Sequence, residues 1–272
     1  MQLSRNDELN WNVYTAPLTA IGPMGQLIAT DKVAQVRDDN YEVLGITSKS
    51  YEVLQNDTLK QLVMPMVEEG LLTIQNMGFI GGGSKVFIQA QMSEEYTVAG
   101  DTTRGMISLL NSHDGTSAFA GGVTAQRVIC SNTFAMAMQD MSKRLRHTAG
   151  VAQKALELKE VIEFVNSGMD IYTQAAEKLA LVKCSETQLD RVIEHAFNKK
   201  EGQKPQGYNK IVRLFRTGRG NDGTTLLDTV NGITEYLTHE SQKNDLKRFV
   251  SNNFGTKAVV ARRAMDMALA LC

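Results

Sequence analysis

Residues 71–92, LLTIQNMGFIGGGSKVFIQAQM, decide the fold of the N-terminal half. Apolar and polar residues alternate along the second part of this stretch, which is typical of a strand with one face toward a core. One face holds Val86, Ile88, Ala90 and Met92, and the other holds Lys85, Phe87, Gln89 and Gln91. The residues Gly81–Ser84 supply a turn between the two arms. The stretch therefore predicts an antiparallel hairpin over residues 71–80 and 85–92.

Further strands are expected around this hairpin, at residues 33–37, 41–47, 105–111 and 118–128. Asp38-Asp39-Asn40 separates the first two of them, and Asp114-Gly115 separates the last two; both are turn sequences. Short connections between antiparallel strands indicate a meander.

A short helix is expected at residues 57–69, with Asp57 as its cap. Leu62, Met66 and Leu59 should face inward, and Pro65 should kink or end the helix.

The apolar period changes from two to 3.6 after Asn132, which predicts helices in the rest of the chain. The first helix is expected to begin at Ser131 or Asn132 and to place Phe134, Met138, Met141 and Leu145 on one side. A longer helix over residues 150–182 has a heptad-like seam of Leu158, Ile162, Val165, Met169, Tyr172, Ala176 and Leu179. This seam can pack on the protein's own sheet or mediate self-association.

A capping box of Ser185 and Gln188 starts the next helix. Breaks are expected at NKKEGQKPQGYNK and at residues 217–223, and helices resume at about 224–239, 243–251 and 256–271. The sequence thus predicts an α+β protein. An antiparallel meander in the N-terminal half is backed by a helix and followed by a helical C-terminal half. Residues 1–148 form the sheet region and residues 149–272 the helical region, in one integrated domain.

Composition limits the classes of protein that this chain can belong to. Its 272 residues are 42% hydrophobic, enough for a core without disulfides. The net charge of -1 excludes a uniformly basic surface. Three cysteines without metal-ligand spacing indicate reduced thiols, and the N-terminus has no apolar leader segment. No apolar run is long enough to cross a membrane. We expect a cytoplasmic protein of a bacterial or archaeal host that does not enter membranes.

Four short runs resemble the phage/plasmid-like protein family, a prokaryotic family whose activity is unknown. They are residues 111–117 (NSHDGTS), 127–133 (RVICSNT), 146–148 (RHT) and 234–239 (TEYLTH). The resemblance extends from about residue 30 to the C-terminus and implies a gene of a mobile element. The order of elements, strands followed by a long helix, is also similar to that of Rad52-type annealing proteins. Likeness of fold alone does not establish function.

A basic segment suggests contact with nucleic acid. Residues 199–219 hold seven basic residues against Glu201 alone, with Tyr208 and Phe215 interleaved. Cations neutralise phosphates and aromatic rings stack on bases. The candidate DNA-binding residues are Lys199, Lys200, Lys204, Tyr208, Lys210, Arg213, Arg216, Arg219, Lys143, Arg144 and Arg146. In the structural alternative, the segment is a solvated linker, or Ile211, Val212, Leu214 and Phe215 enter the core.

A second set of residues suggests a metal site or acid–base chemistry. Its members are His113, Asp114, His147, Glu235 and His239. Glu235 and His239 are four residues apart on an expected helix, so both should face one side. In the structural alternative, Asp114 is a turn residue and the helical pair is a surface contact.

Three functions follow from these patterns. The leading hypothesis is a phage- or plasmid-type protein that binds single-stranded DNA and promotes annealing, works as a homo-oligomer and needs no cofactor. The second is an enzyme that holds a divalent metal through the set just described. The third is a structural or host-interaction protein whose helical half binds a partner.

Overall fold

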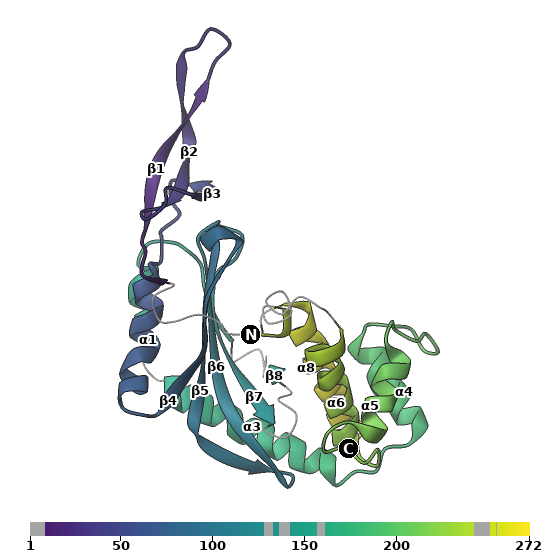
Figure 1. Cartoon of the computed structure of the whole chain (residues 1–272). Helices are drawn as coiled ribbons and strands as arrows, with labels where there is room; N and C mark the ends of the chain where they lie inside the picture. Colours follow the sequence, from purple (N-terminus) through teal and green to yellow (C-terminus); the bar gives the residue numbers. More distant parts are fainter. Residues whose placement is uncertain (1–8, 128–132, 136–141, 157–160, 242–250, 254) are drawn as a thin grey trace. The chain divides into compact units, whose positions relative to one another are not determined.

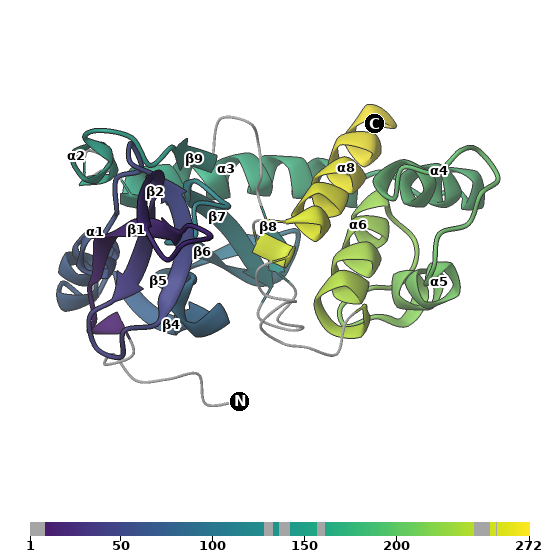
Figure 2. The ribbon, with the colours of Figure 1, turned by 90° about the horizontal axis from the view of Figure 1, so that it is seen from above.

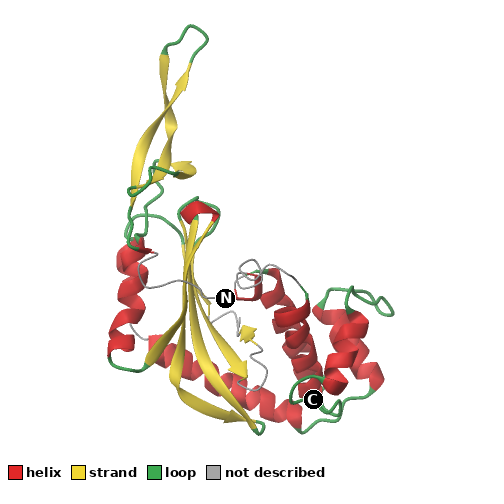
Figure 3. Ribbon diagram, viewed as in Figure 1, coloured by secondary structure: helices red, strands yellow, loops and turns green. Residues whose placement is uncertain are grey.

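The computed structural model describes residues 9–127, 133–135, 142–156, 161–241, 251–253 and 255–272. The protein is α+β, as predicted, and Figure 3 distinguishes its helices from its strands. All but one of the described strands lie in the first half of the chain, and most of the described helices lie in the second half. The strands are β1 (Val13–Ile21), β2 (Leu27–Arg37), β3 (Val43–Ser48), β4 (Leu72–Ile80), β5 (Lys85–Val98), β6 (Asp101–Ser112), β7 (Phe119–Arg127), β8 (Thr133–Ala135) and β9 (Ser142–Leu145).

The strands form two antiparallel sheets. One has the order β1-β2-β3, and the other has the order β4-β5-β6-β7-β8 with β9 also paired to β7. The expected hairpin is present as β4 and β5, joined by the short turn η2 (Gly81–Gly83). All three turn glycines have positive φ, which a residue with a side chain rarely adopts. Every residue from Val86 to Met92 is buried, so both faces of β5 are covered.

Two features of the strands differ from the prediction. The helix expected from Ser131 or Asn132 to Leu145 is wrong, because Thr133–Ala135 and Ser142–Leu145 are strands that pair with β7. Pairing with the sheet here overrides the helical spacing of the apolar residues. Ser131, Asn132, Met138 and Met141 lie outside the described residues. The strand β1 was not expected from the sequence.

Helix α1 (Asn56–Glu68) begins one residue earlier than expected. Gln55 precedes it without a side-chain cap, and Asp57 lies in the first turn instead. The helix continues for three residues beyond Pro65 before it ends. Leu59, Leu62 and Val63 are buried, and Met66 is half-buried.

The chain divides into two compact units, and each draws on three stretches of sequence. Unit 1 contains residues 1–91, 108–121 and 143–161, and unit 2 contains residues 92–107, 122–142 and 162–272. Unit 1 includes the three-stranded sheet, α1 and α2 (Val151–Leu156). Unit 2 includes the remaining helices and the other parts of β5, β6 and β7.

Helix α3 (Val161–Ala180) packs on the sheet within unit 2. Its seam residues Val165, Met169, Tyr172, Ala176 and Leu179 are all buried. A Cβ built on Gly105 of β6 would lie 2.8 Å from Val165 and 3.1 Å from Met169, so helix and strand are in direct contact. The structure therefore favours packing on the protein's own sheet as the role of this seam. Leu158 and the side chain of Ile162 are outside the described residues.

The other helices of unit 2 form a cluster (Figure 2). They are α4 (Glu186–Ala196), α5 (Tyr208–Thr217), α6 (Leu226–Glu235), the π-helical turn η3 (Tyr236–Glu240) and α8 (Thr256–Ala270). The capping box of Ser185 and Gln188 is present as predicted. Helix α5 begins at Tyr208, within the break expected at residues 198–210, and its Ile211, Leu214 and Phe215 are buried. None of the helices in the described ranges is both long and apolar enough to cross a membrane.

Two glycines test the contact between α3 and the sheet. We expect Gly105→Ala to destabilise the protein by about 1–3 kcal/mol, because its methyl group would overlap Val165 and Met169. A Cβ on Gly122 of β7 meets nothing within 4 Å, so Gly122→Ala should change the stability by less than about 1 kcal/mol. Urea unfolding followed by circular dichroism measures both. Equal losses in the two variants would contradict the packing of α3 on β6.

Candidate functional site

Two runs that are far apart in the sequence meet in unit 1. The first is at the end of β6 and the second just follows β9, and both contact the extended segment between β3 and α1. The side-chain amide of Asn111 donates to the carbonyl oxygen of Leu54 at 2.8 Å. The hydroxyl of Tyr51 donates to the carbonyl oxygen of Ser112. The end of β6 is therefore fixed to this segment by side chains rather than by strand pairing.

His113 is fully buried, and its tautomer follows from its neighbours. The amide nitrogen of Asn56 donates to the carbonyl of Trp11 at 2.9 Å, so the amide oxygen is the atom that faces His113. His113 Nε2 lies 2.9 Å from that oxygen and must donate to it. His113 Nδ1 is then unprotonated, and no hydrogen-bond partner for it is found among the described residues.

His147 is held in a similar way. Its Nδ1 lies 3.1 Å from the carbonyl oxygen of Glu52 and donates to it. The backbone N–H of Glu52 donates in return to the carbonyl of His147 at 3.1 Å. The ring of Tyr51 stacks on the imidazole, with centroids 4.6 Å apart and planes at 18°. His147 Nε2 is buried, and it too has no partner in the described part of the chain.

Both imidazoles are neutral near pH 7. Burial lowers the pKa of His113 to about 3, helped by the positive charge that His147 or Arg37 would place nearby and opposed by Asp114. Burial also lowers the pKa of His147, against the effect of its hydrogen bond to Glu52. A neutral imidazole with one nitrogen hydrogen-bonded to a carbonyl oxygen is the form in which histidine binds metal ions.

A third buried acceptor stands in the same sequence run as His113. The side-chain oxygen of Asn111, two residues before His113, is buried and has no partner among the described residues. We call Asn111, His113 and His147, with their partners Tyr51 and Asn56, the imidazole centre. Each buried acceptor without a partner costs about 1–3 kcal/mol. Each of the three atoms is an acceptor, so each suits a cation or a group that donates a hydrogen bond.

Asp114 has a different role from the two histidines. Its carboxylate accepts hydrogen bonds from Ser112 Oγ at 2.5 Å and from Thr116 N at 2.9 Å, and Lys85 Nζ lies 3.1 Å away. Burial works to raise its pKa, but these bonds together lower the pKa to about 2. Strand β3 crosses this turn closely, since a Cβ on Gly45 would lie 2.5 Å from the Cα of Asp114. The Asp114 carboxylate therefore stabilises the turn through its bonds to Ser112, Thr116 and Lys85.

Glu235 and His239 belong to unit 2, whereas His113, Asp114 and His147 belong to unit 1. Glu235 ends α6 and is buried, with its Oε2 unpartnered among the described residues, while His239 is exposed in η3. A π-helical turn has more residues than an α-helical one, so positions four apart no longer share a face. No three His, Cys, Asp or Glu side chains of the described residues group closely enough to hold a metal ion.

An aromatic and cationic layer lies beside His113, and the sequence analysis missed it. The ring of Trp11 is 5.5 Å from the His113 ring. The guanidinium of Arg37 lies 4.1 Å from the centre of the Trp11 ring and 5.0 Å from that of Phe79. Asn111 is the first residue of the run 111–117, but no pattern in the sequence indicated Tyr51, Asn56 or Trp11.

Most cations of the basic segment form ion pairs within unit 2. Lys204 lies 2.6 Å from Asp190 of α4, and Arg216 lies 2.7 Å from Glu186. Glu240 of η3 pairs with both Lys210 and Arg213. Folding thus brings four carboxylates to the segment, namely Glu186, Asp190, Glu194 and Glu240.

Tyr208, the aromatic residue proposed to stack on bases, also has partners within unit 2. The Lys204 ammonium lies 4.2 Å from the centre of the Tyr208 ring, and the Tyr208 hydroxyl donates to Asp190. Lys199, Lys200, Arg219 and Arg146 are exposed. The side chains of Lys143 and Arg144, on β9, lie outside the described residues.

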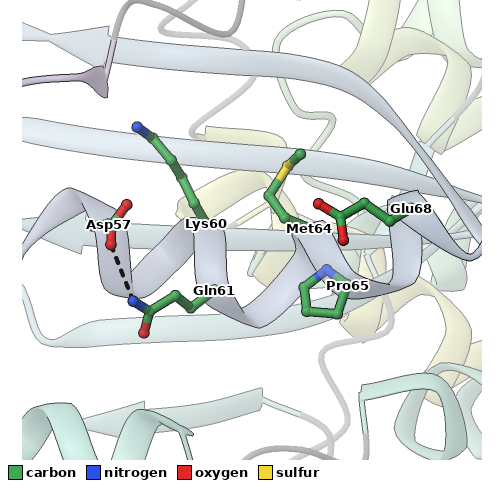
Figure 4. Close-up of a pocket in the computed structure, with 6 residues that line it drawn as sticks. All are labelled: Asp57, Lys60, Gln61, Met64, Pro65 and Glu68. Carbon is green, nitrogen blue, oxygen red and sulfur yellow. Dashed lines mark hydrogen bonds between the residues drawn. The ribbon is translucent and has the colours of Figure 1, made fainter.

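The exposed side of α1 has an open hollow of about 410 Å³ (Figure 4). Its lining residues are Asp57, Lys60, Gln61, Met64, Pro65 and Glu68. Gln61 donates a hydrogen bond to Asp57 at 3.0 Å, which occupies part of the polar lining. No residue of the imidazole centre lines this hollow, so it adds nothing to that site.

Residues 43–268 match the model of a family described as a domain of unknown function, DUF932. The match includes every residue of the imidazole centre and begins after β1 and β2. No curated protein and no solved structure matches the chain.

The burial of His113 predicts a dependence of stability on pH. The unfolded chain binds a proton at His113 near pH 6.5, whereas the folded chain resists protonation down to about pH 3. The stability that neutral His113 contributes to the folded state is therefore fully present above pH 6.5 and is lost as the pH falls toward 3. When the pH falls from 7.5 to 5.5, proton uptake by His113 in the unfolded chain should lower the free energy of unfolding by about 1 kcal/mol.

Urea unfolding at these two pH values, in buffer with a chelator, measures this loss. We expect His113→Gln to reduce the pH dependence and His195→Gln, at an exposed helical histidine, to leave it unchanged. His147→Gln should also reduce it, because burial lowers that pKa too. An unchanged dependence in both His113→Gln and His147→Gln would contradict the neutral, buried state of the two rings.

Proposed function

The chain belongs to the DUF932 family, and we propose that it is a metal-dependent enzyme that holds one divalent cation through His113 and His147. The observation that supports this proposal is the pair of buried, neutral imidazoles, each with one nitrogen bonded to a carbonyl oxygen and the other unpartnered. Zinc and similar cations prefer imidazole nitrogen as a ligand.

The surrounding residues would prepare the two histidines for such a cation. Asn56 and Glu52 fix the tautomers, as the carbonyl partners of metal-binding histidines do. Tyr51 stacks on His147, and its hydroxyl bond to Ser112 keeps the ring in place. Burial raises the pKa of Tyr51, so its hydroxyl stays protonated and continues to donate. When bound, the cation would acidify water or polarise a carbonyl or phosphoryl oxygen.

Zinc titration of the chelator-treated full chain tests this proposal. We expect one Zn²⁺ per chain by calorimetry, and at least about tenfold weaker binding in His113→Gln and His147→Gln. His239→Gln replaces an exposed histidine of unit 2 and should bind as the unchanged chain does. Circular dichroism shows whether the variants fold. If Zn²⁺ does not bind at about 100 µM, or if His239→Gln is as weak as His147→Gln, the proposal fails.

A second candidate function is that of a phage- or plasmid-type DNA-metabolism protein that binds single-stranded DNA and promotes annealing. Its support is the exposed group of Lys199, Lys200 and Arg219, for which no ion pair is found among the described residues. Four of the seven basic residues pair with four carboxylates, so the seven cations exceed these acids and Glu201 by two charges. Such an excess favours weak, salt-sensitive binding over a tight complex.

Binding of a labelled single-stranded oligonucleotide at several salt concentrations tests this second function. We expect affinity to fall as salt rises, and the double variant Lys199→Ala with Lys200→Ala to flatten the slope. The matched control is Lys178→Ala with Lys183→Ala, which removes two exposed lysines elsewhere in unit 2. No binding at about 50 mM salt, where attraction is strongest, would exclude this function.

A further inference from the structure

Strands β1 and β2 form a two-stranded ribbon that ends in an uncharged turn. Figure 1 shows both strands continuing beyond β3, which pairs only with residues 32–36 of β2. No residue from Val13 to Thr30 is charged. We call residues 21–28, which contain the turn and the strand ends beside it, the ribbon tip.

The polar groups of the ribbon tip bond to one another. The backbone N–H of Gly22 donates to the carbonyl oxygen of Gln26 at 2.8 Å, and that of Gly25 donates to the carbonyl oxygen of Gly22 at 2.9 Å. Gln26 has the only polar side chain of the tip, and its amide oxygen accepts from Met24 N at 3.1 Å. Pro23 has no N–H. Each backbone donor from Gly22 to Gly25 is therefore used within the tip, as it must be where water is absent.

The apolar side chains of the ribbon tip are exposed instead. Ile21 and Leu27 are cross-strand partners, and they are 76% and 72% exposed. Ile28 follows Leu27 along β2, so it lies on the other face of the ribbon, where it is 47% exposed. Met24, in the turn itself, is 92% exposed. The tip is thus apolar on both faces and at its end, which makes it a wedge rather than one face of a sheet.

The charges nearest the ribbon tip limit what kind of surface it can meet. Along β2 the first charged residues are Asp31 and Lys32, and their side chains form an ion pair at 4.0 Å, so they add no net charge. Asp38 and Asp39 follow the other end of β2, roughly 30 Å from the tip and well beyond the screening length of about 8 Å. The tip has no cation for the phosphates of a nucleic acid or for an anionic membrane. An uncharged apolar surface remains as its complement.

We propose that the ribbon tip inserts into the interfacial layer of a lipid bilayer with zwitterionic headgroups. Such headgroups need no counter-charge from the protein, and Ile21, Met24 and Leu27 would leave water for the upper part of the acyl chains. The hydrogen bonds within the turn would keep its backbone donors satisfied there. The contact is peripheral, because the tip enters one leaflet and does not cross the bilayer. The proposal is independent of the imidazole centre and of DNA binding.

Co-sedimentation of the full chain with phosphatidylcholine vesicles tests the insertion. We expect the unchanged chain to bind at about 1 mM lipid, and binding to change little between about 50 and 500 mM salt, because the tip has no charge. The double variant Ile21→Ser with Met24→Ser should bind at least about tenfold more weakly, since it removes two large apolar side chains. Leu181→Ser replaces a leucine of unit 2 that is 87% exposed, and it should bind as the unchanged chain does.

A tryptophan in the turn reports the insertion directly. The natural Trp11 is buried, so its emission is already that of an apolar site. The emission of Met24→Trp should shift to shorter wavelength when vesicles are added, because the indole would leave water. Leu181→Trp is the matched control and should show no shift.

Three results would overturn the proposal. They are an unchanged chain that does not bind the vesicles at about 1 mM lipid, equal binding by the double variant, and a Met24→Trp emission that stays unshifted. Light scattering after size-exclusion chromatography identifies a different occupant of the tip. An oligomer that the double variant abolishes, in a chain that does not bind vesicles, would assign the tip to a second copy of this chain.

Discussion

The side-chain amide of Asn56 is the hydrogen-bond junction on which the centre of unit 1 depends. Its nitrogen donates to Trp11, and its oxygen accepts from His113. One residue thus joins the entry to β1, the start of α1 and the end of β6. Because Asn56 is buried, water cannot replace either bond. The same amide selects the tautomer of His113, so the unpartnered Nδ1 is a consequence of how the segments are joined.

The sequence predicts the fold best where local patterns and tertiary pairing agree. The glycine turn and the alternation after it gave β4 and β5 in the right order. Strand β1 was not expected from the sequence, and it contains Pro17, a residue that is rare within strands. Pro17 is tolerated because β1 is an edge strand and the register shifts just after this residue. The helix expected after Asn132 is absent from the described residues there, because Phe134 and Leu145 lie in strands that pair with β7. The spacing of apolar residues cannot reveal that β7 offers an edge for this pairing.

The candidate site was predictable only in part. The runs 111–117 and 146–148 singled out His113 and His147, which the structure places in the same unit. Their partner Asn56 has no distinguishing pattern, because a buried hydrogen bond across the fold leaves no periodic trace. The basic segment was overestimated for a related reason. A charge count along residues 199–219 omits acids such as Glu186 and Glu240. These acids lie outside the segment in the sequence, and folding places them in ion pairs with its arginines.

The close crossing of β3 over the Asp114 turn restricts how this protein can evolve. Any side chain at position 45 would displace the backbone of Asp114, and with it the bonds from Ser112, Thr116 and Lys85. Strands β1 and β2 belong to the same sheet as β3. Within β3, Gly45 is the residue that contacts the Asp114 turn, and it has no side chain. In a saturation mutagenesis scan, Gly45 would therefore tolerate substitution as poorly as a functional residue does, although it contributes no chemical group to the site.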